Sequence, residues 1–189
     1  QVMLENNLVK EGYVAIGADS HTCTYGAVGA FAAGVGSTDL GAVLLTGKTW
    51  LRVPETIKII LNGKLPDGVS GKDVILHIIG DVKSDGATYM AVEFDGDGFA
   101  SLSNEDAITI CNMTVEMGAK NGVIVQAVKN PEFKPDEDAI YKKILKFNAN
   151  DIEPVISCPH NVDNVMKVSE KKGQKINQVY IGSCTNGRL

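Results

Sequence analysis

Residues 56–82 read TIKIILNGKLPDGVSGKDVILHIIGDV, and the spacing of their apolar residues changes from that of a strand to that of a helix. The isoleucine-rich run Thr56–Leu61 predicts a buried strand. A stretch rich in Gly, Pro and Asp follows and predicts turns. Ser70, with Asp73 three residues later, marks the start of an amphipathic helix that ends near Val82. A strand followed by a helix of this kind is the repeating unit of an α/β fold.

The same alternation continues on both sides of this unit. Further strands are predicted at 13–16, 90–94, 122–126 and 176–181, and further helices from Ser37, at 103–117 and at 136–146. Between Gly26 and Gly36 most residues are small, which permits close packing of backbones. In α/β folds, ligands bind beyond the carboxyl ends of strands, and we expect the functional residues there.

Composition indicates a folded chain and excludes several classes of protein. The chain has 189 residues, of which 44% are apolar, enough to build a core. A net charge of −5 argues against a nucleic-acid-binding surface. The longest uncharged stretch, 22–38, is interrupted by glycines, so no membrane span is expected. Four scattered cysteines without a C-x-x-C pair are typical of reduced thiols, and we expect a cytoplasmic protein.

The first candidate site is the run Asp19-Ser20-His21, which places a carboxylate, a hydroxyl and an imidazole at one junction of strand and loop. Neighbouring side chains of an extended chain point to opposite sides, so these three do not converge as a hydrolase triad. No G-x-S-x-G motif is present. From the residues alone, a polar pocket and a hydrogen-bonded turn are equally open interpretations.

The second candidate is the pair Asn112 and Glu116, which are four residues apart and share one face of the helix predicted over 103–117. Taken alone, such a pair predicts a solvated helix surface. Nothing in the spacing by itself connects this pair to the first candidate.

The third candidate is Cys184, in the loop Gly182-Ser183-Cys184-Thr185-Asn186 that follows the predicted strand 176–181. Such a loop exposes the sulfur and directs backbone N–H groups at it, which favours a thiolate that ligates a metal or an iron–sulfur cluster. The alternative is a buried cysteine at a turn. Cys158-Pro159-His160 looks like half a zinc site, but no partner pair has suitable spacing, so a structural role is expected.

Three segments, in this order, resemble motifs of the aconitase superfamily of iron–sulfur hydro-lyases. They are GADSHT at 17–22, ICNM through EMGA at 110–119, and IGSCTN at 181–186. The sequences SHTCT at 20–24 and NGRL at 186–189 are more similar to the large subunits of isopropylmalate dehydratases than to mitochondrial-type aconitase. Two-subunit homoaconitases are nearly as similar. The resemblance covers the whole chain but less than half of the family's catalytic subunit, so we expect an internal piece of a longer protein.

Carried over by position, the resemblance implies a [4Fe–4S] cluster with Cys184 as one ligand and further ligands beyond Leu189. Five side chains are implied to lie around the substrate: Asp19, Ser20, His21, Asn112 and Glu116. The implied reaction isomerises a 2-hydroxy acid by dehydration and rehydration, as in the conversion of 2-isopropylmalate to 3-isopropylmalate in leucine biosynthesis. A small subunit is the implied partner, and this piece alone is expected to be inactive.

The implied fold is a set of aconitase-like, three-layer α/β/α subdomains with mixed, largely parallel sheets. We expect 1–53 to end a first subdomain, 54–150 to form a second, and 151–189 to begin a third that carries the Cys184 loop. Two non-enzymatic interpretations stay open. One is an RNA-binding relative, against which the net charge of −5 and the lack of basic runs argue. The other is a vestigial structural domain.

Overall fold

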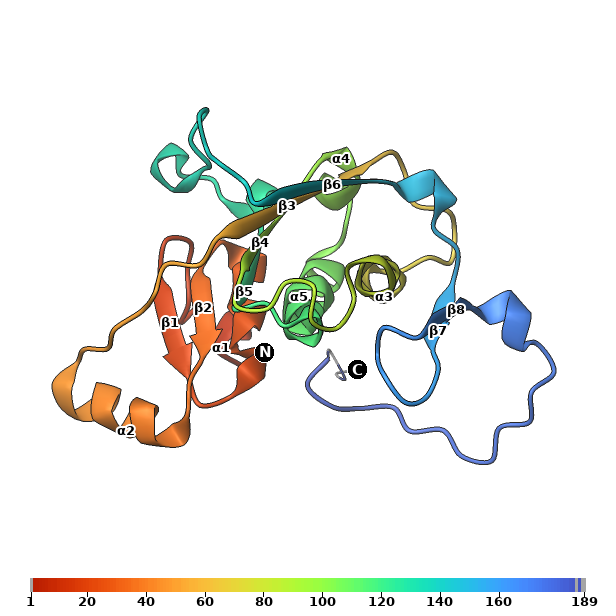
Figure 1. Cartoon of the computed structure of the whole chain (residues 1–189), viewed down its shortest axis with the longest axis horizontal. Coiled ribbons are helices and arrows are strands. Elements are labelled where there is room, and N and C mark those ends of the chain that lie inside the picture. The colour runs from red at the N-terminus through yellow and green to blue at the C-terminus, as the bar shows by residue number, and fades with distance from the viewer. Residues whose placement is uncertain (1, 186, 188–189) are drawn as a thin grey trace.

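The computed structural model describes residues 2–185 and residue 187, so Gln1, Asn186, Arg188 and Leu189 lie outside the described residues. Within the described part, the strands form three sheets (Figure 1). A parallel sheet of order β5-β4-β3-β6 contains β3 (Thr56–Asn62), β4 (Ala91–Asp95), β5 (Asn121–Ile124) and β6 (Lys143–Asn148). A parallel pair contains β1 (Val14–Gly17) and β2 (Phe31–Gly34), and an antiparallel pair contains β7 (Val155–Ser157) and β8 (Val165–Lys167). The α/β fold with largely parallel sheets is confirmed, while the domain boundaries after residues 53 and 150 stay a prediction.

Helices connect these strands. The α-helices are α1 (Val2–Glu5), α2 (Ser37–Thr46), α3 (Gly71–Val82), α4 (Asp97–Ala100) and α5 (Asn104–Met113). The 3₁₀ helices are η1 (Ser20–Val28), η2 (Thr114–Met117), η3 (Val125–Ala127), η4 (Pro131–Phe133), η5 (Ala149–Asp151) and η6 (Val168–Lys171). Helices α3 and α5 cover one face of the four-stranded sheet (Figure 1).

The core lies between β3 and these two helices. Alternate residues of β3, Ile57, Ile59 and Leu61, are buried against the apolar side of α3, as the change of spacing in 56–82 predicts. Each fully buried isoleucine or leucine stabilises the fold by about 1.5–3 kcal/mol relative to an exposed one. The start of α3 is fixed by Asp73, whose Oδ2 accepts a hydrogen bond from the Ser70 backbone N–H at 2.9 Å.

The β1–β2 pair is joined to the four-stranded sheet through two side chains, one in β5 and one just before it. The Ala32 backbone N–H donates to Asn121 Oδ1 at 3.1 Å, and Lys120 Nζ donates to the Gly34 carbonyl at 3.0 Å. A Cβ added to Gly26 of η1 would lie 1.6 Å from the Gly122 carbonyl oxygen of β5. Glycine at this position therefore lets η1 pack directly on the strand backbone, which is the close approach expected between 26 and 36.

One predicted helix is wrong. Residues 136–146 were expected to form an exposed helix, but β6 occupies Lys143–Asn148 and pairs with β3 along its whole length. The alternation of β6 places the partly buried Leu145 and Phe147 against the core. Ile140, Tyr141, Ile144 and Leu145 have the spacing of an apolar helix face, so local spacing favoured a helix. The edge of β3 instead offers backbone hydrogen bonds to this segment, and long-range pairing prevails.

A predicted strand is also wrong in this structure. Residues 176–181, all within the described range, form no strand, and their apolar side chains are exposed. A strand requires a neighbour for its backbone N–H and C=O groups, and the described residues place none beside this segment. The Cys184 loop was expected to follow the end of a strand, and in the structure it follows irregular chain instead.

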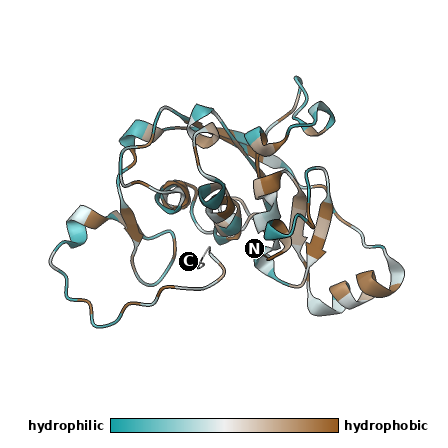
Figure 2. Ribbon diagram, turned by 180° about the vertical axis from the view of Figure 1, so that it is seen from behind, coloured by the Kyte–Doolittle hydropathy of each residue, from teal (hydrophilic) through white to brown (hydrophobic). Residues whose placement is uncertain are grey.

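Helix α2 is apolar but buries none of its residues and lies at the edge of the molecule, where Figure 2 shows its hydrophobic colouring. Its Leu44 and Leu45 are 79% and 90% exposed. Among the described residues, no helix has both the length and the apolar composition needed to cross a membrane.

Candidate functional site

Four segments of the chain meet around one polar hollow of about 300 Å³. Its lining comes from α1, from η1 and the residue that caps it, from α5 and from the Cys184 loop: Val2, Asp19, His21, Thr22, Thr24, Tyr25, Asn112 and Cys184. All three motifs singled out in the sequence are represented. The tertiary structure thus brings together Asp19, His21, Asn112 and Cys184.

The segment 19–24 folds into a tight 3₁₀ turn because its own side chains bond to its backbone. Asp19 caps η1, accepting the His21 N–H on Oδ1 at 2.7 Å. Thr22 Oγ1 donates to the Asp19 carbonyl and Thr24 Oγ1 to the His21 carbonyl, both at 2.6 Å. The polar pocket and the hydrogen-bonded turn, posed as alternatives, are therefore both present in the same residues.

His21 lies between two carboxylates. Its Nδ1 is 3.3 Å from Asp19 Oδ1, and its Nε2 is 3.7 Å from Glu116 Oε1. The His21 side chain is 24% exposed, Glu116 39% and Asp19 71%, so the ring is partly shielded while one carboxylate faces solvent. Both ring nitrogens thus face a carboxylate, which restricts the orientation of the ring.

Ser20 lies apart from this hollow. Its Oγ is 3.3 Å from His21 Nδ1, but its side chain is exposed. It lines a neighbouring hollow together with Trp50 and Lys120. Of the three residues in the Asp19-Ser20-His21 run, only the first and third therefore line the polar hollow, as expected of neighbours that point to opposite sides.

Asn112 is buried, so the solvated-pair interpretation from its helical spacing is wrong for this residue. It is 2% exposed, and its amide bonds to Thr24, to the Cys184 carbonyl and to Thr185. Helix α5 ends at Met113 and continues as the 3₁₀ helix η2, so Asn112 and Glu116 are not one regular α-helical turn apart. Glu116 instead reaches the site through His21.

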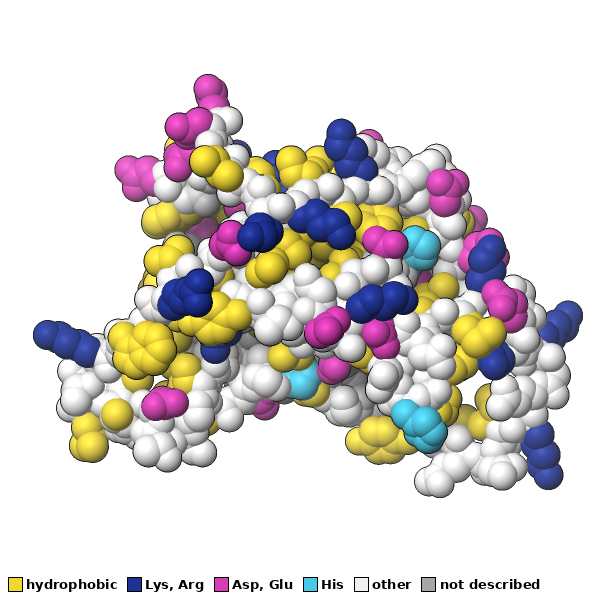
Figure 3. All heavy atoms as spheres, viewed as in Figure 1, with side chains coloured by type: hydrophobic (Ala, Val, Ile, Leu, Met, Phe, Trp, Pro, Cys, Tyr) yellow, Lys and Arg dark blue, Asp and Glu magenta, His cyan; other side chains and the backbone are white. Residues whose placement is uncertain are grey.

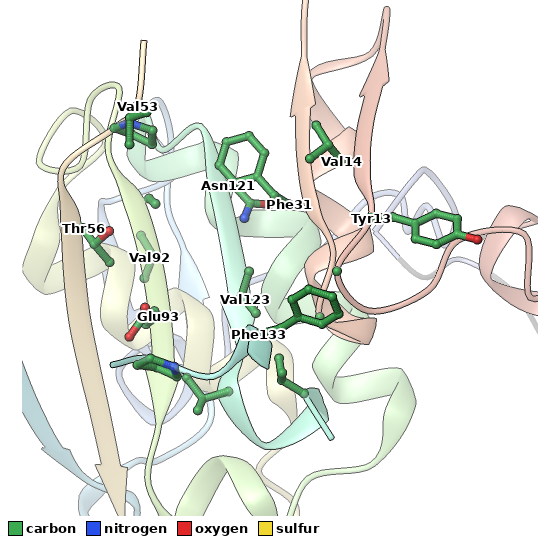
Figure 4. A pocket seen from close by; sticks show the side chains of 17 residues that line it. Tyr13, Val14, Phe31, Val53, Thr56, Val92, Glu93, Asn121, Val123 and Phe133 are labelled. Carbon is green, nitrogen blue, oxygen red and sulfur yellow. The ribbon is translucent and has the colours of Figure 1, made fainter. Parts of the chain in front are cut away.

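A second hollow, of about 400 Å³, is larger but lacks the predicted residues. It lies between the β1–β2 pair and strands β3, β4 and β5, and Figure 4 shows Phe31, Val92, Val123 and Phe133 around it. Its one charged lining residue, Glu93, accepts a hydrogen bond from the Tyr141 hydroxyl at 2.6 Å. We assign the candidate site to the smaller hollow because the groups able to do chemistry converge there.

The carboxyl ends of β3 and β6, where the sheet order reverses, are filled by the chain itself. Asp97 Oδ1 accepts the Gly63 N–H at 3.0 Å, and Asn150 Oδ1 accepts the Lys64 N–H at 3.2 Å. The polar hollow instead contains residues that directly follow β1. The candidate site thus lies beyond a strand end of the small parallel pair rather than of the larger sheet.

Comparison with known proteins gives one consistent family. The family described as "Aconitase family (aconitate hydratase)" matches residues 1–129. The chain belongs to the aconitase family. A 3-isopropylmalate dehydratase large subunit 2 of Archaeoglobus fulgidus is 49% identical over 202 residues, which cover 100% of this chain and 48% of that protein.

Two further aconitase-family relatives show whether sequence identity can distinguish a dehydratase subunit from a homoaconitase subunit. A 3-isopropylmalate dehydratase large subunit 1 of Methanopyrus kandleri is 48% identical, over all of this chain and 48% of that subunit. A probable methanogen homoaconitase large subunit of Methanothermobacter thermautotrophicus is 49% identical, over all of this chain and 47% of that subunit. The chain spans about half the length of the curated relatives it matches, and identity does not separate the two names.

Membership of the aconitase family implies an iron–sulfur cluster, and the cysteines of this chain differ in their fitness as ligands. Burial raises the pKa of the Cys23 thiol to about 12 and that of Cys111 well above its usual value, so both stay protonated. Cys158 lines a different hollow, beside β7. Cys184 is exposed and faces the polar hollow, so it fits as one ligand.

The described residues do not complete a metal site by themselves. Over 2–185 and 187, no group of three or more His, Cys, Asp or Glu side chains is placed to hold a metal ion, and Cys158 and His160 form no such group. Cys184 therefore fits as one donor among others and not as a whole site.

Sequence reasoning missed two residues of this aconitase-family site, Thr24 and Thr185. Thr24 lines the hollow, and both threonines bond to the Asn112 side chain. Each lies one residue after a cysteine, and Thr185 is inside a quoted motif. A threonine at a turn does not by itself indicate a functional site, because its hydroxyl usually bonds to the nearby backbone.

Proposed function

We propose that this chain supplies the general acid and one cluster ligand in the active site of a [4Fe–4S] hydro-lyase, the large subunit of a 3-isopropylmalate dehydratase. The observation that supports this best is the convergence of His21, with its two carboxylates, and the exposed Cys184 on one hollow. A cluster ligand beside a proton-transfer group fits dehydration of a hydroxy acid by a Lewis-acid iron together with a general acid.

His21 is the proposed proton donor to the departing hydroxyl. In dehydration the substrate C–O bond breaks, the neighbouring carbon loses a proton, and water leaves. The imidazole supplies the proton that turns the hydroxyl into water, while Glu116, 3.7 Å from Nε2, orients the ring. In rehydration His21 takes a proton from the attacking water, so hydroxyl migration needs no net proton from this group.

Asp19 holds His21 in place through both the backbone N–H and Nδ1. When bound, a [4Fe–4S] cluster with an open iron position supplies Lewis acidity at the substrate hydroxyl and carboxylate. Cys184 would hold it, with the other ligands outside the described residues. The base that removes the carbon-bound proton and the groups that recognise the substrate side chain are assigned to the rest of the protein and to a small subunit.

A homoaconitase is the second candidate, because a probable homoaconitase large subunit is as similar to this chain as the dehydratase subunits are. The two functions share the cluster and the proposed role of His21. They differ in substrate, so a comparison of kcat/KM on 2-isopropylmalate and on a homoaconitase substrate separates them.

The test uses the whole large subunit with its small subunit, reconstituted with iron and sulfide without oxygen. We expect iron, visible absorbance and formation of 3-isopropylmalate from 2-isopropylmalate. Cys184→Ser should abolish iron retention, whereas Cys158→Ser, the matched control at a partly buried cysteine elsewhere, should retain it. Full iron and activity in Cys184→Ser would overturn the ligand assignment.

Kinetic variants then test the acid–base assignment. His21→Ala and Glu116→Gln should retain the cluster and lower kcat by about 10²–10⁴-fold, the usual contribution of a positioned acid or base. Gln126, whose amide donates to Asp95 away from the hollow, provides a control in Gln126→Ala. Unchanged kcat in both His21→Ala and Glu116→Gln would contradict the proposal.

A further inference from the structure

A continuous chain of hydrogen bonds runs from the backbone of His21 to the Cys184 loop. Thr24 Oγ1 donates to the His21 carbonyl at 2.6 Å and accepts from Asn112 Nδ2 at 2.9 Å. Asn112 Oδ1 accepts from Thr185 Oγ1 at 3.0 Å, and Asn112 Nδ2 also donates to the Cys184 carbonyl at 3.3 Å. Each group in this chain has the partner that its donor or acceptor character requires.

The centre of the chain is buried and fixed. Asn112 is 2% and Thr24 4% exposed. The Cys23 thiol donates to the Asn112 carbonyl at 3.5 Å, which satisfies a carbonyl in the last turn of α5. Because burial raises the pKa of Cys23 to about 12, this thiol keeps the proton that it donates. Cys23 and Thr24, adjacent residues of η1, thus both bond to Asn112 of α5.

We infer that Asn112, Thr24 and Thr185 are positioning residues that clamp the Cys184 loop at a set place relative to His21. This inference rests on the proposed function only in naming Cys184 as a cluster ligand. Both amide protons of Asn112 and one lone pair of its oxygen are engaged by protein groups. Its side chain is therefore committed to holding the loop, not to binding substrate.

Within residues 2–185 and 187, the chain that leads into the loop gives it no support from a strand. The preceding residues 176–181 form no strand and are exposed. Buried hydrogen-bond networks gain strength from the low dielectric around them, and a missing member leaves the others unpaired. Loss of either hydroxyl should therefore loosen the ligand loop without removing a ligand.

The test compares hydroxyl-deletion variants with their conservative partners in the whole large subunit. Thr24→Val and Thr185→Val remove one hydroxyl each, and Thr24→Ser and Thr185→Ser restore it. Thr109→Val is the matched control, because Thr109 is a buried threonine of α5 whose hydroxyl bonds to the Glu105 carbonyl within the helix, outside the clamp.

Two readouts are measured. In the cluster-free protein, the rate of Cys184 alkylation by iodoacetamide should rise severalfold in both valine variants. In the reconstituted protein, loss of visible absorbance to a chelator should be about 10–100-fold faster, the usual effect of removing a group that orients a metal ligand. The serine variants and Thr109→Val should resemble the wild type in both readouts.

Asn112→Ala separates a shared clamp from two independent effects. If the hydroxyls act through Asn112, adding Thr24→Val or Thr185→Val to Asn112→Ala should produce no further change. Full additivity, or valine variants equal to Thr109→Val in both readouts, would overturn the clamp. A wild type that takes up no cluster would remove the proposed function, and the alkylation rates would then decide the clamp alone.

Discussion

The two sides of the polar hollow are built in opposite ways. Segment 19–24 is fixed by its own threonine hydroxyls, by the Asp19 cap and by the packing of η1 on β5. The Cys184 loop follows an exposed, irregular segment and contacts the scaffold through Asn112. His21, the proposed proton donor, therefore belongs to the sheet scaffold, whereas the loop of the proposed ligand Cys184 depends on a few side-chain hydrogen bonds.

The largest expected effect on stability comes from disturbing the scaffold side. Gly26→Ala would place a methyl group 1.6 Å from the Gly122 carbonyl oxygen, and both atoms belong to backbone or are attached to it. We expect the free energy of unfolding to fall by about 3 kcal/mol, the upper part of the usual range for overpacking. Urea unfolding of the whole protein measures this change.

The control for this substitution is in the same chain. Gly41 lies inside α2, and a Cβ there would meet nothing within 4 Å. Gly41→Ala should raise the free energy of unfolding by up to about 1 kcal/mol, because alanine is the better helix former. Equal effects of the two substitutions would contradict the packing of η1 on β5.

Limited proteolysis tests the other side of the hollow, the exposed chain that leads into the Cys184 loop. Lys172 and Lys175 lie in exposed, irregular chain before the Cys184 loop, whereas Lys58 is in β3 and Lys120 bonds to the Gly34 carbonyl. Trypsin should cut after Lys172 and Lys175 well before it cuts after Lys58 and Lys120, because cleavage requires a locally open backbone. Mass spectrometry of early fragments identifies the order, and early cleavage at Lys58 would refute the contrast.

Thiol reactivity extends the comparison to single side chains. At pH about 8, with a pKa of about 12, only about one Cys23 thiol in ten thousand is ionised, and the residue is also buried. Cys184 is exposed. Iodoacetamide should therefore label Cys184 in the native, cluster-free protein and label Cys23 and Cys111 only after unfolding. Native labelling of Cys23 at the rate of Cys184 would contradict the burial of η1.

The smallest effect concerns an ion pair on the far face of the scaffold sheet, Lys58 Nζ to Asp95 Oδ2 at 2.7 Å. Burial alone would raise the pKa of Asp95, but Lys58 and the Gly96 N–H hold it below its usual value. A lowered folded-state pKa contributes stability above the unfolded value, about pH 4, and this contribution is lost as pH falls through the folded value.

Lys58→Met should therefore lower the free energy of unfolding by about 1 kcal/mol at neutral pH, and the difference from wild type should shrink in acid as Asp95 becomes protonated. Lys142→Met is the control, because its pair with Glu55 at 3.2 Å is more exposed. Urea unfolding at several pH values measures both. If the difference in free energy of unfolding between Lys58→Met and wild type grew as the pH fell, it would contradict the lowered pKa of Asp95.

Charge on the surface agrees with the acidic composition. Figure 3 shows lysine and arginine interspersed with aspartate and glutamate on the viewed face rather than gathered into one basic patch. Proteins that bind nucleic acid through phosphates concentrate positive charge along one face. On this face, nothing favours the RNA-binding alternative.

The sequence by itself determined the elements whose signals are local. Ser70 with Asp73 and Ser103 with Asp106 mark the starts of α3 and α5, and Gly118 ends η2 in a left-handed conformation. These signals suffice because a cap or a terminating glycine acts within one turn of the chain. The three motifs could also be recognised from the sequence, because each is a contiguous stretch of it.

Only the tertiary structure decided which partners meet. Residues 143–148 became a strand because the edge of β3 was available, and 176–181 remained irregular because no described strand lies beside them. Asn112 is buried rather than on the surface because η1 and the Cys184 loop both bond to it at the end of α5. Burial and long-range pairing depend on segments far apart in the chain, and local spacing carries no information about them.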